Sequence, residues 1–114
     1  MEHFYNLNKE PFYFVSHGLK DIEMRLFDEK RKLIQIGDII YFENNETHEV
    51  IKTLVIGLHR FPTFKELYET FPKTRLGYFE NEEASYHDMN KYYSDERIKE
   101  CGVIGIEIKL IGKK

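Results

Sequence analysis

The most informative stretch of the sequence is Gly18-Leu19-Lys20-Asp21-Ile22-Glu23-Met24-Arg25. Its second half alternates between apolar and charged residues, as expected of a β-strand whose successive side chains point to opposite faces. The apolar side chains of this strand, which belong in a hydrophobic core, are Ile22, Met24 and Leu26. The opposite face places Glu23 beside Arg25, and Lys20 comes just before the strand. This convergence of two cations and a carboxylate predicts a binding site.

The three ionic side chains have complementary chemistry. Arg25 can hold a phosphate or carboxylate in a bidentate manner, and Lys20 can supply a point charge or, if desolvated, a base. Glu23 can accept hydrogen bonds from the exocyclic amine of a nucleobase. The alternative is structural: an ion pair from Glu23 to Arg25 or Lys20 that holds a corner of the sheet. Such a pair would add little net stability, because desolvation offsets attraction.

Several β-strands surround this segment in the sequence. A first strand is expected at His3–Leu7, followed by a short helix that Asn8 begins and Gly18 ends. After a charged, turn-like run at 28–32, for which both a solvated loop and a phosphate-contacting loop stay open, strands are expected at Ile39–Phe42 and Val50–Phe61. Within the latter, Gly57 marks an expected bulge or bend.

The second half of the chain contains the clearest helix signals. Thr63-Phe64-Lys65-Glu66 is a capping box that predicts a helix to about Phe71, before Pro72. Further helices are expected from Ser85 toward Tyr93 and from Ser94 to Cys101, and a last strand at Val103–Leu110. Together these elements predict one α+β domain over residues 1–114. Its core would be a small, mostly antiparallel β-barrel of about five strands with three or four helices around it.

Composition limits the class of protein. The 114 residues fit a single domain, with 41% hydrophobic and 32% charged residues. The net charge of −3 argues against indiscriminate coating of RNA, which needs a broad basic face, although a local patch can still bind it. The single Cys101 excludes an internal disulfide, and no apolar run approaches a membrane span, so we expect a cytoplasmic protein.

The Gly-x-Lys-x-x-Glu-x-Arg pattern of residues 18–25 resembles the signature of the ASCH domain, a relative of the PUA-type RNA-binding barrel. Further landmarks of this resemblance follow in order at Gly37-Asp38, Thr63–Leu67, Tyr92-Tyr93 and Gly102–Ile106. The resemblance implies a PUA-like barrel with a cleft beside the motif strand, and RNA or a nucleotide-like molecule as its ligand.

Enzymatic activities are also implied by the resemblance. One bacterial branch hydrolyses the acetyl amide of N4-acetylcytidine with the motif lysine, a threonine and a later glutamate. Lys20 matches that lysine, Glu23 stands in place of the threonine, and Glu69 lies in the region of the later glutamate. A second branch contains ribonucleases. An amidohydrolase acting on an acylated nucleoside is therefore an alternative function, and a protein-interaction module with a purely structural motif is another.

The candidate ligand-binding residues are Lys20, Glu23, Arg25, Tyr5 and Tyr93. Tyrosines are included because single-stranded RNA bases stack on aromatic rings. For an enzyme, the catalytic candidates are Lys20, Glu23 and Glu69. The histidines are scattered and predict no metal site, and no cofactor is implied. We expect a monomer or weak dimer.

Overall fold

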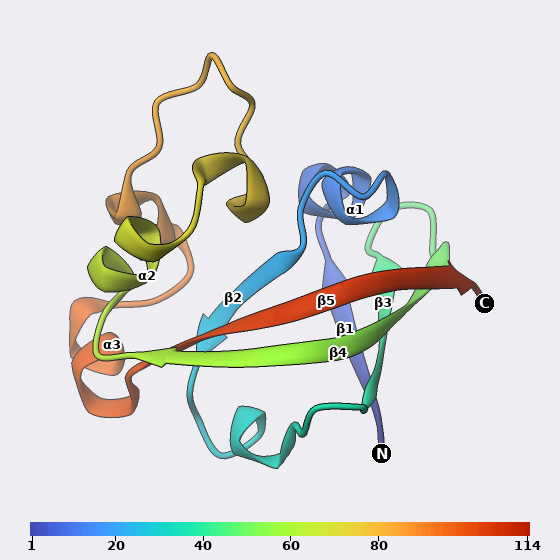
Figure 1. The fold of residues 1–114 in the computed structure, drawn as a ribbon, viewed down its shortest axis with the longest axis horizontal. Helices are drawn as coiled ribbons and strands as arrows, with labels where there is room; N and C mark the ends of the chain where they lie inside the picture. Colours follow the sequence, from blue (N-terminus) through green and yellow to red (C-terminus); the bar gives the residue numbers. More distant parts are fainter.

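The computed structural model describes residues 1–114 and has one five-stranded sheet that curls into a half-barrel (Figure 1). The strands are Glu2–Leu7 (β1), Ile22–Leu26 (β2), Ile39–Asn44 (β3), Val50–Phe61 (β4) and Val103–Lys113 (β5). Their order in the sheet is β1-β3-β4-β5-β2. The β1–β3 pair is parallel and the other three pairs are antiparallel, which confirms a small, mostly antiparallel sheet.

Short helices surround the sheet, and none is long and apolar enough to cross a lipid bilayer. The α-helices are Lys9–Ser16 (α1), Phe64–Thr70 (α2) and Asp95–Cys101 (α3). The 3₁₀ helices are Arg31–Leu33 (η1), Lys73–Leu76 (η2) and Tyr86–Lys91 (η3). The predicted mixed α+β architecture is therefore confirmed. The helix expected from Ser85 toward Tyr93 is the 3₁₀ helix η3, where the Ser85 hydroxyl accepts a hydrogen bond from the His87 amide.

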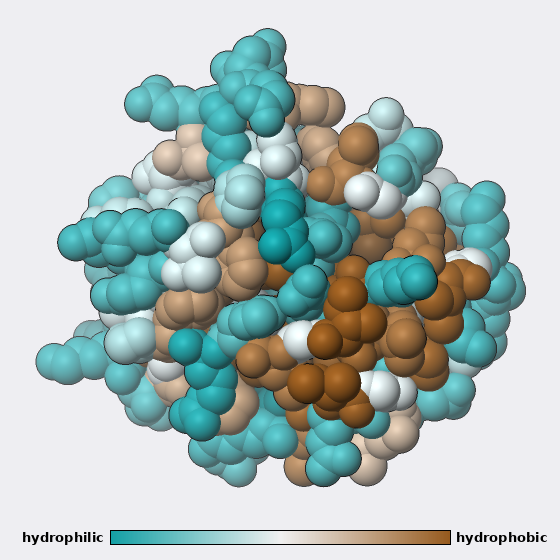
Figure 2. Space-filling model, viewed as in Figure 1, coloured by the Kyte–Doolittle hydropathy of each residue, from teal (hydrophilic) through white to brown (hydrophobic).

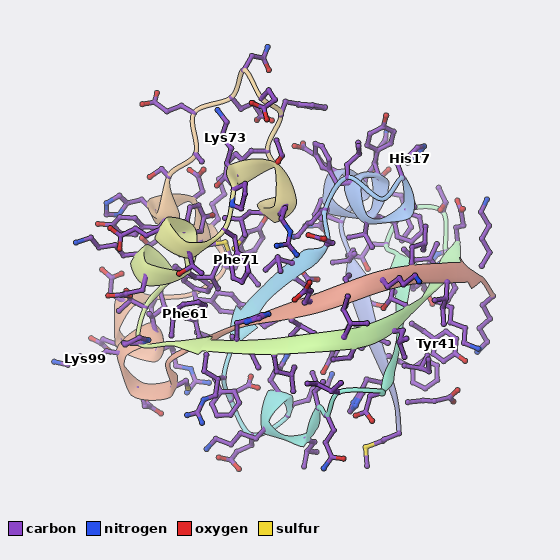
Figure 3. The ribbon with its side chains drawn as sticks, viewed as in Figure 1. His17, Tyr41, Phe61, Phe71, Lys73 and Lys99 are labelled. Carbon is purple, nitrogen blue, oxygen red and sulfur yellow. The ribbon has the colours of Figure 1, made fainter.

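The predicted capping box begins α2 as the sequence indicates. The Thr63 amide donates to the Glu66 carboxylate at 3.1 Å, and the Thr63 hydroxyl bonds to the same carboxylate. Phe64 and Leu67 of this helix are buried against the sheet. Phe61 at the end of β4 and Phe71 just after α2, both labelled in Figure 3, pack against the hydrophobic cluster that contains Phe64 and Leu67. The cap thus fixes where α2 begins and which face it buries.

Two hydrophobic cores lie on opposite faces of the sheet. The core inside the half-barrel is closed by α1 and contains, among others, Phe12, Phe42, Val55 and Ile106. The second core lies between β2 and the helices of the second half of the chain, and it contains Met24, Leu67, Leu76 and Ile98. Because β2 contacts the second core, its apolar face points away from the half-barrel interior.

Alternation along β2 sets the position of its charged residues. Ile22, Met24 and Leu26 belong to the second core, as predicted from their spacing. Glu23 and Arg25 therefore point to the other face of the strand. β2 pairs with β5 alone, so its other edge is free, and β1 at the far end of the sheet has a free edge as well. The half-barrel thus stays open between β1 and β2.

The bulge predicted in β4 is present, with a register shift against β5 between Val55 and Gly57. A Cβ atom at Gly57 would lie 2.7 Å from Oε1 of Glu107 and 2.9 Å from Nε2 of His59. These two side chains bond to each other at 2.9 Å. The absence of a side chain at position 57 therefore leaves room for the Glu107–His59 pair. β5 itself continues to Lys113, three residues beyond the predicted end.

Candidate ligand-binding cleft

The Lys20, Glu23 and Arg25 side chains converge as their spacing predicts. Nζ of Lys20 lies 3.0 Å from Oε1 of Glu23, and Nη2 of Arg25 lies 3.1 Å from Oε2. The Met24 amide also donates to Oε1 of Glu23, at 3.2 Å. Glu23 is 3% exposed, and the side chains of Lys20 and Arg25 are 10% and 16% exposed. We call these three residues the ionic triad.

The two cations determine the charge state of Glu23. Burial alone would raise the pKa of the Glu23 carboxyl, because it removes the charged form from water. Attraction and hydrogen bonding from Lys20 and Arg25 outweigh that effect and lower the pKa to about 2. Glu23 is therefore ionised throughout the physiological pH range, and it holds both cations in place.

The triad lines a cavity of about 630 Å³ beside the free edge of β2. One wall comes from the end of β1 and from α1, including Asn6, Pro11 and Phe14. The facing wall comes from α2 and from residues 76–93, and it includes Leu76 and Met89. Lys73, labelled in Figure 3, donates from Nζ to the Glu82 carbonyl at 2.6 Å and so ties this connection together. The cleft thus occupies the gap between the open edges of the half-barrel.

A chain of tyrosine hydroxyls lies in the facing wall and was not predicted from the sequence. The Tyr78 hydroxyl donates to Oδ2 of Asp88 at 2.7 Å and lies 2.9 Å from the Tyr68 hydroxyl. Because Tyr78 gives its proton to Asp88, Tyr68 is the donor to Tyr78. Burial, together with these hydrogen bonds, raises the pKa of Tyr78, so the chain is uncharged. The two tyrosines and Asp88 come from three separate segments, and no local spacing connects them.

The other predicted site residues lie in different surroundings. Tyr93 lines the cleft, as does Tyr92, which is 58% exposed. Tyr5 does not line it: its ring is 4% exposed and lies beneath Arg25, with 5.2 Å from the ring centroid to Cζ. Glu69 is exposed on α2 and is also outside the cleft. The structure thus brings together the triad and Tyr93, and leaves Glu69 apart from them.

Comparison with known proteins identifies the family. The ASCH domain model matches residues 6–111. The crystal structure of hypothetical protein PH0355 is 33% identical, with a TM-score of 0.82, and the match covers 97% of this chain and 100% of that one. The solution structure of PF0455 from Pyrococcus furiosus is 30% identical, with a TM-score of 0.71 and coverage of 97% and 98%.

A more distant structure has the same fold. The S128A mutant of ZmASCH from Zymomonas mobilis is 14% identical, with a TM-score of 0.68, and the match covers 95% of this chain and 67% of that one. No protein with a curated description matches the sequence. The family match extends over nearly the whole length and includes the triad, the cleft walls and most of the curled sheet, and on this ground the protein belongs to the ASCH domain family.

Proposed function

We propose that this protein binds RNA or a nucleotide-like molecule in the cleft beside β2, with the ionic triad as the recognition element. The observation that carries the proposal is the position of the triad. Three ionisable side chains lie in the wall of a cavity instead of beneath a helix, although their desolvation is unfavourable. A purely structural role would be served as well by apolar residues of similar volume.

Each member of the triad has a distinct proposed role. Arg25 keeps N–H groups beyond the one bonded to Glu23, and these can donate to an anionic or carbonyl oxygen of the ligand. Lys20 supplies a second positive charge, bonded to the other carboxylate oxygen of Glu23. Glu23 bonds to both cations, so we assign it the role of orienting them. This differs from direct pairing with a nucleobase amine, the role considered from the sequence.

Aromatic rings in the cleft can stack on a nucleobase of the ligand. Tyr92 and Tyr93 both line it, and their ring centroids are 6.3 Å apart. Stacking of a base on an aromatic ring stabilises single-stranded nucleic acid complexes by about 1–3 kcal/mol per base. Tyr92 offers the more accessible ring for such stacking because it is largely exposed.

Titration with short single-stranded RNAs and with a panel of nucleosides and nucleotides tests the proposal. Arg25→Gln should weaken binding by about tenfold or more, because it removes a charge that contacts the ligand in a largely desolvated position. Arg97→Gln is the matched control, since Arg97 forms an exposed ion pair with Glu100 outside the cleft. Equal affinities for the two variants would contradict the proposal.

The same experiments separate the alternative functions. Release of acetate from N4-acetylcytidine, abolished by Lys20→Met, would replace the binding proposal with an amidohydrolase. Glu69 lies outside the cleft, so such an enzyme would need a different second carboxylate from the one considered above.

Absence of any nucleic-acid ligand would favour a protein-interaction module. That alternative would use the outer face of β4 and β5, where apolar residues gather in Figure 2 and where Ile56 and Ile111 are exposed. An interaction module would also leave the triad with a structural role only.

A further inference from the structure

Three cationic side chains surround the ring of Tyr5, next to the cleft. Nζ of Lys30 lies 4.5 Å from the ring centroid, Cζ of Arg31 lies 4.9 Å from it, and Cζ of Arg25 lies 5.2 Å from it. Arg25 comes from β2, Tyr5 comes from β1, and the other two come from the turn at 28–32 and η1. The fold therefore gathers positive charge at the open seam of the half-barrel. We call Tyr5, Arg25, Lys30 and Arg31 the Tyr5 cluster.

Positive charge exceeds negative charge at this seam. Glu23 is paired with both Lys20 and Arg25, and Asp28 is paired with Arg31 at 3.2 Å. Lys30 takes part in none of the ion pairs of the structure. The triad and the Tyr5 cluster together contain four cations, and only two carboxylates, Glu23 and Asp28, pair with them. This leaves an excess of two positive charges in a chain whose net charge is −3. Like charges held this close repel one another unless an anion joins them.

Two buried polar atoms in the Tyr5 cluster have no hydrogen-bond partner. They are the hydroxyl oxygen of Tyr5 and Nε of Arg31. A buried donor without a partner is destabilising, and native structures contain few of them. Both atoms belong to side chains that already face the excess positive charge, so an oxygen-rich anion suits them.

The Tyr5 cluster is continuous with the cleft through Arg25. This side chain lines the cavity, lies over the Tyr5 ring, and places Nη2 3.5 Å from the carbonyl of Asn6, another residue of the cleft wall. Burial raises the pKa of the Tyr93 hydroxyl, and Arg25 and Arg31 both act on it in the opposite direction. Tyr93 lines the cleft together with Arg25, so a ligand beside it would lie close to that guanidinium group.

We propose that the Tyr5 cluster is a phosphate subsite that adjoins the cleft at Arg25, so that the ligand is a phosphorylated nucleotide unit and not a nucleoside or free base. This inference rests on the proposed nucleotide-binding function and specifies the class of ligand. The phosphate oxygens accept hydrogen bonds from Arg25, Lys30 and Nε of Arg31, and the Tyr5 hydroxyl donates to one of them. Lys20 lies at the other end of the triad, with its side chain against Gly77, and faces the sugar or base.

Calorimetric titration of the whole chain tests this inference with three kinds of probe. They are the four ribonucleosides, their 5′-monophosphates together with inorganic phosphate, and a short single-stranded RNA. The monophosphates should bind at least about tenfold more tightly than the nucleosides, because a phosphate adds charge-assisted hydrogen bonds. Inorganic phosphate should compete with the monophosphates but not with the nucleosides.

Lys30→Gln and Lys32→Gln form a matched pair of variants. Lys30 precedes η1 and Lys32 lies within it, two residues further on, where it pairs with Glu29 and faces the Phe27 ring. Lys30→Gln should weaken monophosphate and RNA binding by about threefold to tenfold and leave nucleoside binding unchanged. Lys32→Gln should leave all affinities unchanged. Equal losses in both variants would overturn the subsite, since they would indicate general electrostatic attraction.

Tyr5→Phe separates binding from packing, because it removes only the hydroxyl that lacks a partner. The variant should be as stable as the parent protein or more so, and its monophosphate affinity should fall by about threefold. Unchanged monophosphate affinity would overturn the role of Tyr5.

If nucleosides bind as tightly as monophosphates, the subsite is wrong while the proposed function stands. If no nucleoside, nucleotide or RNA binds, both are wrong.

Discussion

At the scale of single residues, Glu23 is a buried carboxylate held between two cations. Its carboxylate is almost completely buried, and both oxygens are engaged by cations. A buried ion pair adds little net stability compared with an apolar replacement, but removal of one partner leaves the other charges uncompensated. Glu23 therefore keeps Lys20 and Arg25 ordered at the cleft.

Glu23→Gln should destabilise the protein strongly. The amide keeps the shape of the side chain but removes the negative charge between two cations, so we expect a loss of about 3 kcal/mol or more in the free energy of unfolding. Urea denaturation followed by circular dichroism measures it. Glu100→Gln is the control, because Glu100 belongs to an exposed ion pair, and its effect should be below about 1 kcal/mol. Similar losses in the two variants would contradict the burial of the triad.

The pH dependence of stability should carry the signature of Glu23. Its pKa is about 2 in the folded state, below the value of about 4.3 for an unperturbed glutamate. The folded-state pKa is the lower one, so the contribution is fully present above about pH 4.3 and is lost as the pH falls toward 2. The loss amounts to about 3 kcal/mol.

Unfolding free energies between pH 6 and pH 3 for the parent protein and Glu23→Gln provide the measurement. The variant should show the shallower dependence, although it keeps the acid-sensitive contribution of Asp38, whose pKa is also lowered to about 2. Parallel curves for the two proteins would show that Glu23 is not paired as the structure has it.

At the scale of elements, the bulge in β4 makes room for a group of polar contacts that joins η2 to the sheet. Glu107 of β5 accepts one hydrogen bond from Arg75 at 3.0 Å, and its Oε1 lies 2.9 Å from Nε2 of His59 in β4. Arg75 in η2 also pairs with Asp21, just before β2. The segment that forms one wall of the cleft is therefore fastened to the sheet through the position that Gly57 leaves open.

Gly57→Ala should destabilise the protein by about 1 kcal/mol, because its Cβ would displace the ends of the partly exposed Glu107 and His59 side chains and break their bond. Thermal unfolding measures the effect. In a Glu107→Ala background the same substitution should have a much smaller effect, since the obstructing carboxylate is gone. Additive effects of the two substitutions would show that the steric conflict is not the cause.

Local signals in the sequence predicted much of the fold. The alternation of β2, the capping box of α2 and the bulge at Gly57 each depend on neighbouring residues, and each is present in the structure. The convergence of Lys20, Glu23 and Arg25 depends on the same alternation and was predicted as well.

Long-range contacts were beyond what spacing can predict. Tyr78 lies in an irregular connection, and its contact with Tyr68 and Asp88 depends on how α2, η2 and η3 pack together. The placement of Lys30 and Arg31 over Tyr5 likewise depends on the turn before η1 folding back onto β1. No periodicity links these segments, so the wall of the cleft and the Tyr5 cluster could be identified only from the structure.

At the scale of the whole molecule, the cleft exists because the sheet does not close. β1 and β2 are the two edges of the sheet, and Arg25 spans the gap between them toward Asn6. Edge strands are usually protected by charged side chains or by covering elements. Here the triad and residues 76–93 protect the open edge of β2. The same arrangement that protects the edge provides a lined cavity for a ligand.

Salt dependence of binding should be shallow, because the positive charge is local and the whole chain is acidic. With about one or two phosphates contacted, the slope of log K against log salt concentration for a single-stranded RNA should be about −0.7 to −1.4. Titrations at several salt concentrations measure the slope. A slope steeper than about −4 would require a broad basic face, and this would contradict a single recognition cleft.

The most direct test of the central claim is an NMR titration of the ¹⁵N-labelled protein with a short single-stranded RNA, observed through backbone amide shifts. We predict that the largest changes occur at β2 and at residues 76–93, around the ionic triad. Changes confined to the outer face of β4 and β5, near Ile56 and Ile111, or no changes at all, would contradict the assignment of the cleft as the ligand site.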